Sequence, residues 1–308
     1  MKVAIPIFCF VIMGLFVFQP LFGQNWWEEE KARQQSGTIV TYEGNIGGNG
    51  VKALANYEHQ YMEFEASATV DMKEMENEVQ AELMAKSAAE LRAYAEAAKF
   101  ISGVMVGAVY NAEKTLAKDE QVIGKVEKTL VKFARKIEDK VEWRNNVPLA
   151  TVKLGVLFQN KNGLIDMVIP AIIEQTHQLG ISPYQPQSNI NPPGNLYTGV
   201  IIDARGLNVS PSIAPMILTG TENRQVYGSL TVSRDYAVQN GIVGYYKTME
   251  AAKSDVNRVG NNPLVIQAEK TAINNHHLCI NETDATRIYG ADLQSGFLKE
   301  CRVGIVVD

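Results

Sequence analysis

Residues 72–103 (MKEMENEVQAELMAKSAAELRAYAEAAKFISG) decide the fold that we predict for this chain. The stretch holds no proline, its only glycine is Gly103 at the end, and strong helix formers make up most of it. Asp71 is a suitable N-cap and Gly103 a suitable stop. We therefore predict one long helix. Apolar residues that recur at steps of three or four residues, or multiples of them, give it one apolar stripe: Val79, Leu83, Leu91, Ala95 and Ala98.

Alanine is unusually frequent in the same stretch. Eight alanines lie between Ala81 and Ala98. Small side chains allow another element to approach closely, so we expect this helix to lie flat on a sheet or on a second helix. The pattern favours a packing role for the helix over a binding role.

The flanking segments predict further elements of the same domain. Residues 120–143 have a helical pattern with Asp119 as N-cap and charges on the outer face. The apolar positions of this second long helix are Val122, Val126, Leu130, Phe133, Ile137 and Val141. Residues rich in β-formers predict strands at 38–42, 104–110 and 150–158. The glycine-rich residues 44–50 lack the context of a phosphate-binding loop and predict a turn.

This order of elements resembles a known family. A strand, an alanine-rich helix (AKSAAELRAYAEAAKFISGVMV), a second helix and a closing strand (ATVKLGVLF) are similar to the Lpp-twenty lipoprotein family and to the N-terminal domain of the flagellar protein FlgT. The resemblance covers residues 38–158. It implies an envelope or surface protein, often lipidated, without catalytic residues to carry over. Gln24 stands where a lipidated member would have cysteine, so we expect a non-lipidated variant.

The first residues predict export. Lys2 is followed by a continuous uncharged, mostly apolar run, which Pro20 interrupts before Gly23. This is the plan of a secretory signal peptide at residues 1–23, and an uncleaved membrane anchor is the alternative. Residues 24–37 then form an N-terminal arm with adjacent tryptophans. We expect a mature chain without a membrane span, in the periplasm, outside the cell or associated with the outer membrane.

The remaining chain predicts a second domain. Residues 161–196 contain a short helix with an internal Pro170 and a connector rich in proline and asparagine. In residues 197–308, strand and helix patterns recur. The predicted fold is α+β with two domains, at residues 38–160 and 197–308. Each is a mixed or antiparallel sheet covered by helices, and the first has two long helices.

Cysteine usage leaves two possibilities. The chain has three cysteines and no CxxC pair, and Cys9 falls in the predicted leader. Cys279 and Cys301 therefore remain as an even pair in an oxidising compartment, which favours a disulfide between them. Closing that loop would contribute about 3 kcal/mol in the chain-entropy description. Two free thiols are the alternative.

Metal or cofactor binding has weaker support. His276, His277 and Cys279 lie close together, and strand alternation places His277 and Cys279 on one face. Two such ligands with a distant carboxylate can hold zinc, but a second close pair is missing from the sequence. Asp203 ends an apolar strand pattern, as Asp308 does, which more often marks the exit to solvent than a ligand. We therefore predict no metal, with His276 and His277 as the weak candidates, and no cofactor.

Composition limits the function. A net charge of −5 gives no sign of a nucleic-acid partner, and the sequence lacks the GxSxG and HExxH motifs of hydrolases. We expect a non-enzymatic envelope protein that acts as an interaction or assembly module. Its partners would be other envelope proteins, including flagellar or outer-membrane assemblies. The alternative is a periplasmic protein that binds a small ligand or a metal through His276, His277 and Asp203.

Overall fold

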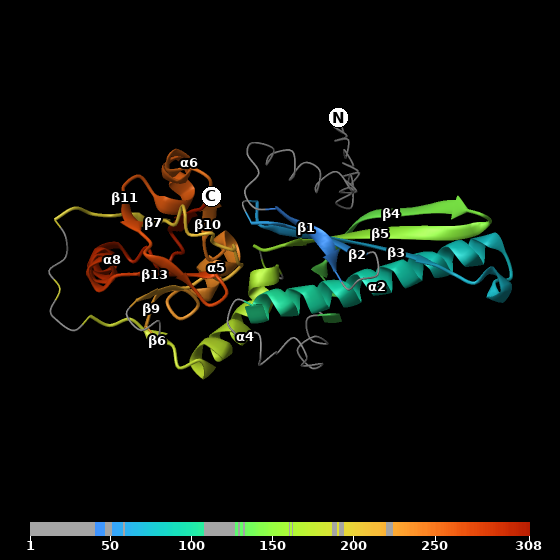
Figure 1. Ribbon diagram of the computed structural model, residues 1–308, viewed down its shortest axis with the longest axis horizontal. Helices are drawn as coiled ribbons and strands as arrows, with labels where there is room; N and C mark the ends of the chain where they lie inside the picture. Colours follow the sequence, from blue (N-terminus) through green and yellow to red (C-terminus); the bar gives the residue numbers. More distant parts are fainter. Residues whose placement is uncertain are drawn as a thin grey trace, which may run out of the picture.

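The computed structural model of the chain describes residues 41–46, 51–57, 59–107, 127–128, 130–131, 133–159, 161, 163–186, 190, 194–219 and 224–308. In these residues it contains helices and three β-sheets, so the α+β fold class is confirmed. An N-terminal part with one sheet and a C-terminal part with two sheets lie side by side along the molecule (Figure 1). The predicted leader and arm, at 1–23 and 24–37, lie outside the described residues.

The N-terminal part is an antiparallel five-stranded sheet with one long helix on one face (Figure 1). The strand order is β1-β2-β3-β5-β4. The bounds are β1 (Thr41–Ile46), β2 (Val51–Asn56), β3 (Tyr61–Thr69), β4 (Arg135–Arg144), β5 (Val147–Leu157) and α2 (Glu78–Gly107). β2 and β3 do not appear among the sequence predictions. Residues 44–46 belong to β1, so the predicted turn is wrong there, and residues 38–40 and 47–50 lie outside the described residues.

Helix α2 begins and ends later than predicted. Asp71 caps the short helix η1 (Met72–Glu74), where its side chain accepts from the Lys73 N–H. Asn77 caps α2 instead, because its Oδ1 accepts from the Gln80 N–H at 2.9 Å. At the other end α2 continues through Gly103, so the strand predicted for 104–110 is wrong up to Gly107, and residues 108–110 lie outside the described residues.

The face of α2 that packs on the sheet is made of alanine, not of the predicted stripe. Five alanines four residues apart are fully buried: Ala81, Ala85, Ala89, Ala93 and Ala97. They lie against β3 and β5, so the predicted flat packing on a sheet is confirmed. Of the predicted stripe, Ala98 is buried, whereas Val79, Leu83 and Leu91 are exposed. Assigning these three residues to the buried face was wrong.

The other face of the sheet is polar. Charged residues of alternating sign cross four neighbouring strands: Lys52, Glu65, Lys153 and Glu138. The nitrogen–oxygen distances along this row are 3.1, 3.7 and 3.6 Å. Opposite charges on adjacent strands favour the antiparallel register, and such a face can remain in water.

The second long helix predicted for 120–143 is wrong over its last third. Residues 135–143 belong to β4, which pairs with β5. Of the rest, 127–128, 130–131 and 133 are helical, and 120–126 lie outside the described residues. Leu130 is fully buried in the core, as its position in the predicted stripe requires.

The C-terminal part contains a four-stranded parallel sheet in the order β10-β14-β7-β11. We expected only mixed or antiparallel sheets, and this sheet is neither. The strands are β7 (Gly199–Asp203), β10 (Gly244–Tyr246), β11 (Pro263–Gln267) and β14 (Val303–Val306). Ile201 and Val306 pack on one face with α6 (Met249–Ser254) and α7 (Val256–Val259). Val200 and Ile202, on the other face, join the main core.

A five-stranded mixed sheet lies beside the parallel one, in the order β12-β13-β8-β9-β6. Its strands are β6 (Ser182–Pro183), β8 (Ile217–Thr219), β9 (Arg224–Tyr227), β12 (Lys270–Ala272) and β13 (His277–Ile280). The remaining helices of this part are α4 (Leu164–Gln178), α5 (Arg234–Asn240) and α8 (Glu282–Ser295). β8 and β9 pair antiparallel, and Pro170 lies inside α4 as expected.

One hydrophobic cluster runs through both parts. It includes Phe64 of the N-terminal sheet and Ile305 of the parallel sheet. The rings of Tyr57 and Tyr245 meet edge to face across the junction, with centroids 6.1 Å apart. Among the described helices, none combines the length and the apolarity needed to cross a membrane.

Candidate functional site

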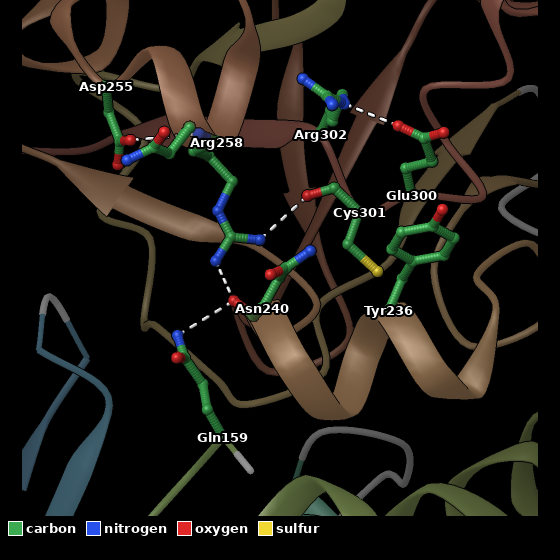
Figure 2. A pocket seen from close by; sticks show the side chains of 9 residues that line it. Gln159, Tyr236, Asn240, Asp255, Arg258, Glu300, Cys301 and Arg302 are labelled. Carbon is green, nitrogen blue, oxygen red and sulfur yellow. Dashed lines mark hydrogen bonds and ion pairs between the residues drawn. The ribbon is translucent and has the colours of Figure 1, made fainter.

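A polar pocket of about 220 Å³ opens at the junction of the two parts (Figure 2). Gln159 contributes from the end of β5, and the other lining residues come from α5, α7 and the segment before β14. They are Tyr236, Asn240, Asp255, Asn257, Arg258, Glu300, Cys301 and Arg302. The pocket therefore depends on both parts of the chain.

Arg258 is the buried charge of this pocket, with 9% of its surface exposed. Its guanidinium donates to the carbonyls of Cys301 and Gly241 at 2.9 and 3.0 Å, and also to the carbonyl of Asn240 (Figure 2). A buried charge must be compensated by hydrogen bonds, and here backbone carbonyls supply them. Arg258 thereby ties the turn after α5 to the segment that leads into β14.

Residues of the N-terminal part hold the same turn from the other side. The buried Gln60 side chain donates to the carbonyl of Val243 at 2.8 Å. Gln159 donates to Gln60 Oε1 at 2.7 Å and to the Asn240 carbonyl at 3.0 Å. Gly241 has a φ of +76°, and a Cβ there would lie 2.1 Å from Gln60 Oε1. We call Gln60, Gln159, Asn240, Gly241 and Arg258 the seam.

The acids around the pocket are also engaged. Asp255 Oδ1 accepts from the Arg258 N–H at 3.1 Å, and its Oδ2 accepts from the Tyr246 hydroxyl at 2.7 Å. Burial, followed by the charge of Asp255, raises the pKa of Tyr246. Glu300 accepts from Arg302 at 2.7 Å. Both carboxylates therefore hold the local chain in place.

Cys301 lies beside this pocket, whereas Cys279 lies in β13. Cys301 belongs to the main core, whereas Cys279 packs in a separate cluster with Met216 and Leu218 under the mixed sheet. Neither residue is in a disulfide in the structure, and the predicted bond between Cys279 and Cys301 stays a prediction, with two free thiols as its alternative. Burial raises the pKa of the Cys301 thiol to about 11, so it stays protonated at neutral pH and is a poor nucleophile.

The two candidate histidines have structural roles. His277 is fully buried, and its Nδ1 accepts from the Met216 N–H at 3.0 Å, which joins β13 to the start of β8. The Nδ1–H of His276 donates to the carbonyl of Ser210 at 2.7 Å. Across the part of the chain that the structure describes, no three His, Cys, Asp or Glu side chains are grouped as metal ligands would be. The weak zinc candidates are therefore not assembled into a site.

The two strand-end aspartates do come together. β7 and β14 are adjacent and parallel, so Asp203 and Asp308 lie at the same edge of the sheet. The Arg205 guanidinium donates to both oxygens of Asp203, at 2.8 and 2.6 Å. These hydrogen bonds hold the pKa of that carboxyl below its ordinary value. Asp308 accepts from the Gly206 N–H. Ligands commonly bind at the carboxyl ends of the strands in parallel sheets. Here the Asp203 carboxylate is already bonded by Arg205.

The exposed side of α2 is the candidate interaction surface. Val79, Leu83, Met84 and Leu91 are 68, 61, 50 and 67% exposed. We call these four residues the α2 stripe. They lie on the helix away from the buried alanines, over the N-terminal half of α2. Contiguous exposed apolar residues mark interaction sites more often than isolated ones do.

Sequence reasoning missed the seam and the role of the α2 stripe. The seam joins residues distant in sequence, so no local pattern could reveal it. The α2 stripe had a readable signal in the strict four-residue spacing of the alanines, which marks a second apolar face. When one helix carries two such faces, only one of them can lie on the sheet.

Comparison with known families gives one finding. Residues 199–308 are similar to the family of the second domain of Tp0624 from Treponema pallidum. The matched region begins with β7 and ends after β14, so it contains the whole parallel sheet. The comparison with curated proteins gives no match. The resemblance of residues 38–158 to the Lpp-twenty family stays a prediction, and the similarity to the Tp0624 second domain is what relates this chain to a known family.

Proposed function

We propose that this chain is an exported, non-enzymatic protein of the cell envelope that acts as an interaction or assembly module. The observation that carries the proposal is the α2 stripe. Its large apolar side chains stand in solvent on a helix whose other face is fully packed. Burying such side chains against a partner would contribute about 1.5–3 kcal/mol for each one fully buried.

The rest of the molecule supports a scaffold role. Arg258, Asp203 and Asp255 are buried or partly buried charged groups, and each is engaged with the chain itself. The thiol beside the pocket is protonated at neutral pH. The polar outer face of the N-terminal sheet is suited to water, which leaves α2 as the apolar face of that part.

The envelope location rests on the sequence. The apolar run at the start of the chain and the resemblance to the Lpp-twenty family both favour export. Partners of the module are then other envelope proteins, with flagellar or outer-membrane assemblies among them.

Site-specific photocrosslinking tests the proposal. A photoreactive amino acid placed at Leu83 on the α2 stripe should give protein adducts in cells that export the chain. The same amino acid at Lys52 is the matched control, because Lys52 is also exposed but lies on the polar face of the sheet. Absence of adducts at Leu83, or equal adducts at both positions, would count against an interaction module.

The junction pocket favours a second candidate function, the binding of a small polar ligand. Its volume suits a small molecule, and Arg302 places a guanidinium at its wall. A shift in melting temperature with a panel of small polar metabolites, lost in Arg302→Ala, would support this function. An unchanged melting temperature across the panel would remove it.

A further inference from the structure

Planar polar side chains make up most of the lining of the junction pocket. Three amides, two carboxylates and two guanidiniums line it, and the remaining two side chains are Tyr236 and Cys301. An amide offers a donor and an acceptor, a carboxylate only acceptors and a guanidinium only donors, each in a fixed plane. A hydroxyl group donates and accepts at the same time. This lining therefore suits a ligand that carries several hydroxyl groups.

The charges of the pocket already have partners within the chain, which favours a neutral ligand. The Arg258 guanidinium is bonded to backbone carbonyls. Arg302 Nε donates to Glu300 Oε2 at 2.7 Å. An anionic ligand would have to compete with Glu300 for Arg302, and a cationic ligand would have to compete with Arg302 for Glu300. A neutral hydroxyl group can bond the other guanidinium nitrogens and the second carboxylate oxygen while this pair stays intact.

Tyr236 gives the pocket one flat apolar wall. Its side chain lines the pocket and is 38% exposed. Tyr236 and Asn240 are four residues apart on α5, so both side chains point to the same side of this helix (Figure 2). The ring of a pyranose sugar has the matching form, because it carries C–H groups on its faces and hydroxyl groups around its edge. An aromatic ring can cover the C–H face while polar groups bond the edge.

The size of the pocket limits the ligand to one such ring. Its volume of about 220 Å³ lies below the range of about 300–1,000 Å³ that is typical for larger organic ligands. At about 30 Å³ for each water molecule, this space corresponds to roughly seven waters, which a single six-membered sugar ring with its hydroxyl groups would displace. A free monosaccharide or one residue of a glycan fits this description.

We propose that the junction pocket binds the ring of a neutral sugar, with Tyr236 against its C–H face and the Glu300–Arg302 pair bonding its hydroxyl groups. Burial of the Tyr236 ring supplies the apolar contribution to affinity, and the planar polar groups supply orientation. The inference names the ligand class for the second candidate function, the binding of a small polar ligand, and rests on that function.

Saturation-transfer NMR of the purified full chain tests the ligand class. The probes are glucose, galactose, mannose and N-acetylglucosamine, and we expect the ring C–H protons of at least one of them to receive saturation. Sorbitol is the matched control, because it carries similar hydroxyl groups on an open chain without a flat C–H face. It should bind at least about tenfold more weakly than the best sugar. Equal binding of sorbitol, or no response from any of the four sugars, would overturn the inference.

Two sources of the sugar can then be separated. The disaccharide of the sugar that binds is titrated beside the monosaccharide. Binding of the disaccharide at least as tightly would support one residue of a glycan as the ligand, whereas binding of the monosaccharide alone would support a free sugar. Both results support the ligand class.

Substitutions on α5 test the role of the aromatic ring. Tyr236→Ala should raise the dissociation constant at least about tenfold, whereas Tyr236→Phe keeps the ring and should stay within about threefold of the wild type. Gln239→Ala is the matched control, because Gln239 is exposed on the same helix and lines a different pocket. It should bind like the wild type. An equal loss in Tyr236→Ala and Gln239→Ala, or an equal loss in Tyr236→Phe and Tyr236→Ala, would overturn the stacking of the sugar on this ring.

The failure of this inference can be distinguished from the failure of the function on which it rests. Glutamate and citrate serve as charged probes in the same melting-temperature measurement. A shift with either of them that Arg302→Ala removes, without binding of any sugar, would overturn the sugar assignment and leave the second candidate function standing. No shift with any small polar molecule, sugars included, would contradict both.

Discussion

At the scale of single residues, Cys301 shows how environment decides chemistry. The residue has a φ of +60° and is almost fully buried at the wall of the junction pocket. Its thiol interacts with the Tyr227 hydroxyl, yet burial is the larger effect and raises its pKa to about 11. A cysteine in a cleft is often a candidate nucleophile, but this one lacks the electropositive, partly exposed setting that stabilises a thiolate.

The first prediction concerns the reactivity of this thiol. At pH 8 the thiolate fraction of a group with this pKa is on the order of one in a thousand, so iodoacetamide should leave native Cys301 unmodified. After unfolding in urea, Cys279 and Cys301 should both be alkylated without prior reduction, because no disulfide joins them in the structure. Peptide mass spectrometry measures both states. Modification of Cys301 in the native chain, or a requirement for reductant in urea, would contradict the structure.

The sequence could not decide between a disulfide and two thiols. Two cysteines in an exported chain favour pairing by number alone. The tertiary structure places the two cysteines in different hydrophobic clusters. Cys279 belongs to the cluster under the mixed sheet, and Cys301 belongs to the main core. The histidines also could not be interpreted from sequence alone. The spacing of His276 and His277 suggests metal ligands, but in the structure each forms a hydrogen bond with a backbone group.

At the scale of elements, α2 shows which patterns can be read and which cannot. Helix propensity and composition predict most of the helix, since these are local properties, but α2 begins and ends a few residues later than predicted. The choice of buried face is not local. Hydrophobicity alone predicts that valine and leucine face the sheet. Alanine faces it instead, because its small side chain lets the helix approach the sheet closely.

A pair of substitutions tests this view of α2. Ala89→Leu should destabilise the chain by about 1–3 kcal/mol, because the added carbons would be forced into a fully packed contact with the sheet. Leu91→Ala on the exposed side should change the free energy of unfolding by less than about 0.5 kcal/mol. Urea denaturation of both variants gives the comparison. The reverse order of effects would show that the leucine side faces the core.

Strand β4 shows a different limit of sequence reading. Apolar residues in 120–143 follow a helical spacing, yet Ile137 and Val141 also alternate with charged residues. A helical and a strand periodicity therefore both fit this segment. It forms a strand because it pairs with β5 over nearly its whole length. Edge-strand charges such as Lys136 and Asp139 contact α2, and this tertiary contact is absent from any local pattern.

At the scale of the whole molecule, the seam and the main core connect the N-terminal part to the C-terminal part. The main core is continuous across the junction, and Gln60 and Gln159 reach the turn that Arg258 holds from the C-terminal part. The segment at 161–196 that composition predicts as a short helix and linker contains α4 and β6, and composition cannot show that both pack with the C-terminal part. The parallel sheet likewise depends on the pairing of distant strands.

Gly241 provides the sharpest test of the seam. Its φ is positive, and a Cβ at this position would lie only 2.1 Å from Gln60 Oε1, so Gly241→Ala must displace the Gln60 side chain, which bonds to Val243 and Gln159. Gly206→Ala is the matched control, because Gly206 has a similar φ of +81° but open space where its Cβ would lie. Backbone strain alone should cost about 1 kcal/mol at either position. We expect Gly241→Ala to lose at least about 1 kcal/mol more, since the clash with Gln60 adds to that strain.

Hydrogen exchange can show where that loss occurs. In the wild-type chain, the amides of β5 and β14 should open with the same free energy, because the core is shared between the two parts. In Gly241→Ala, one strand should open at a lower free energy than the other, since the seam no longer couples them. Gly206→Ala should lower both equally. If the two glycine variants lose the same stability and both keep uniform exchange, the seam is a contact without a coupling role, and the two parts fold as one unit through their apolar core alone.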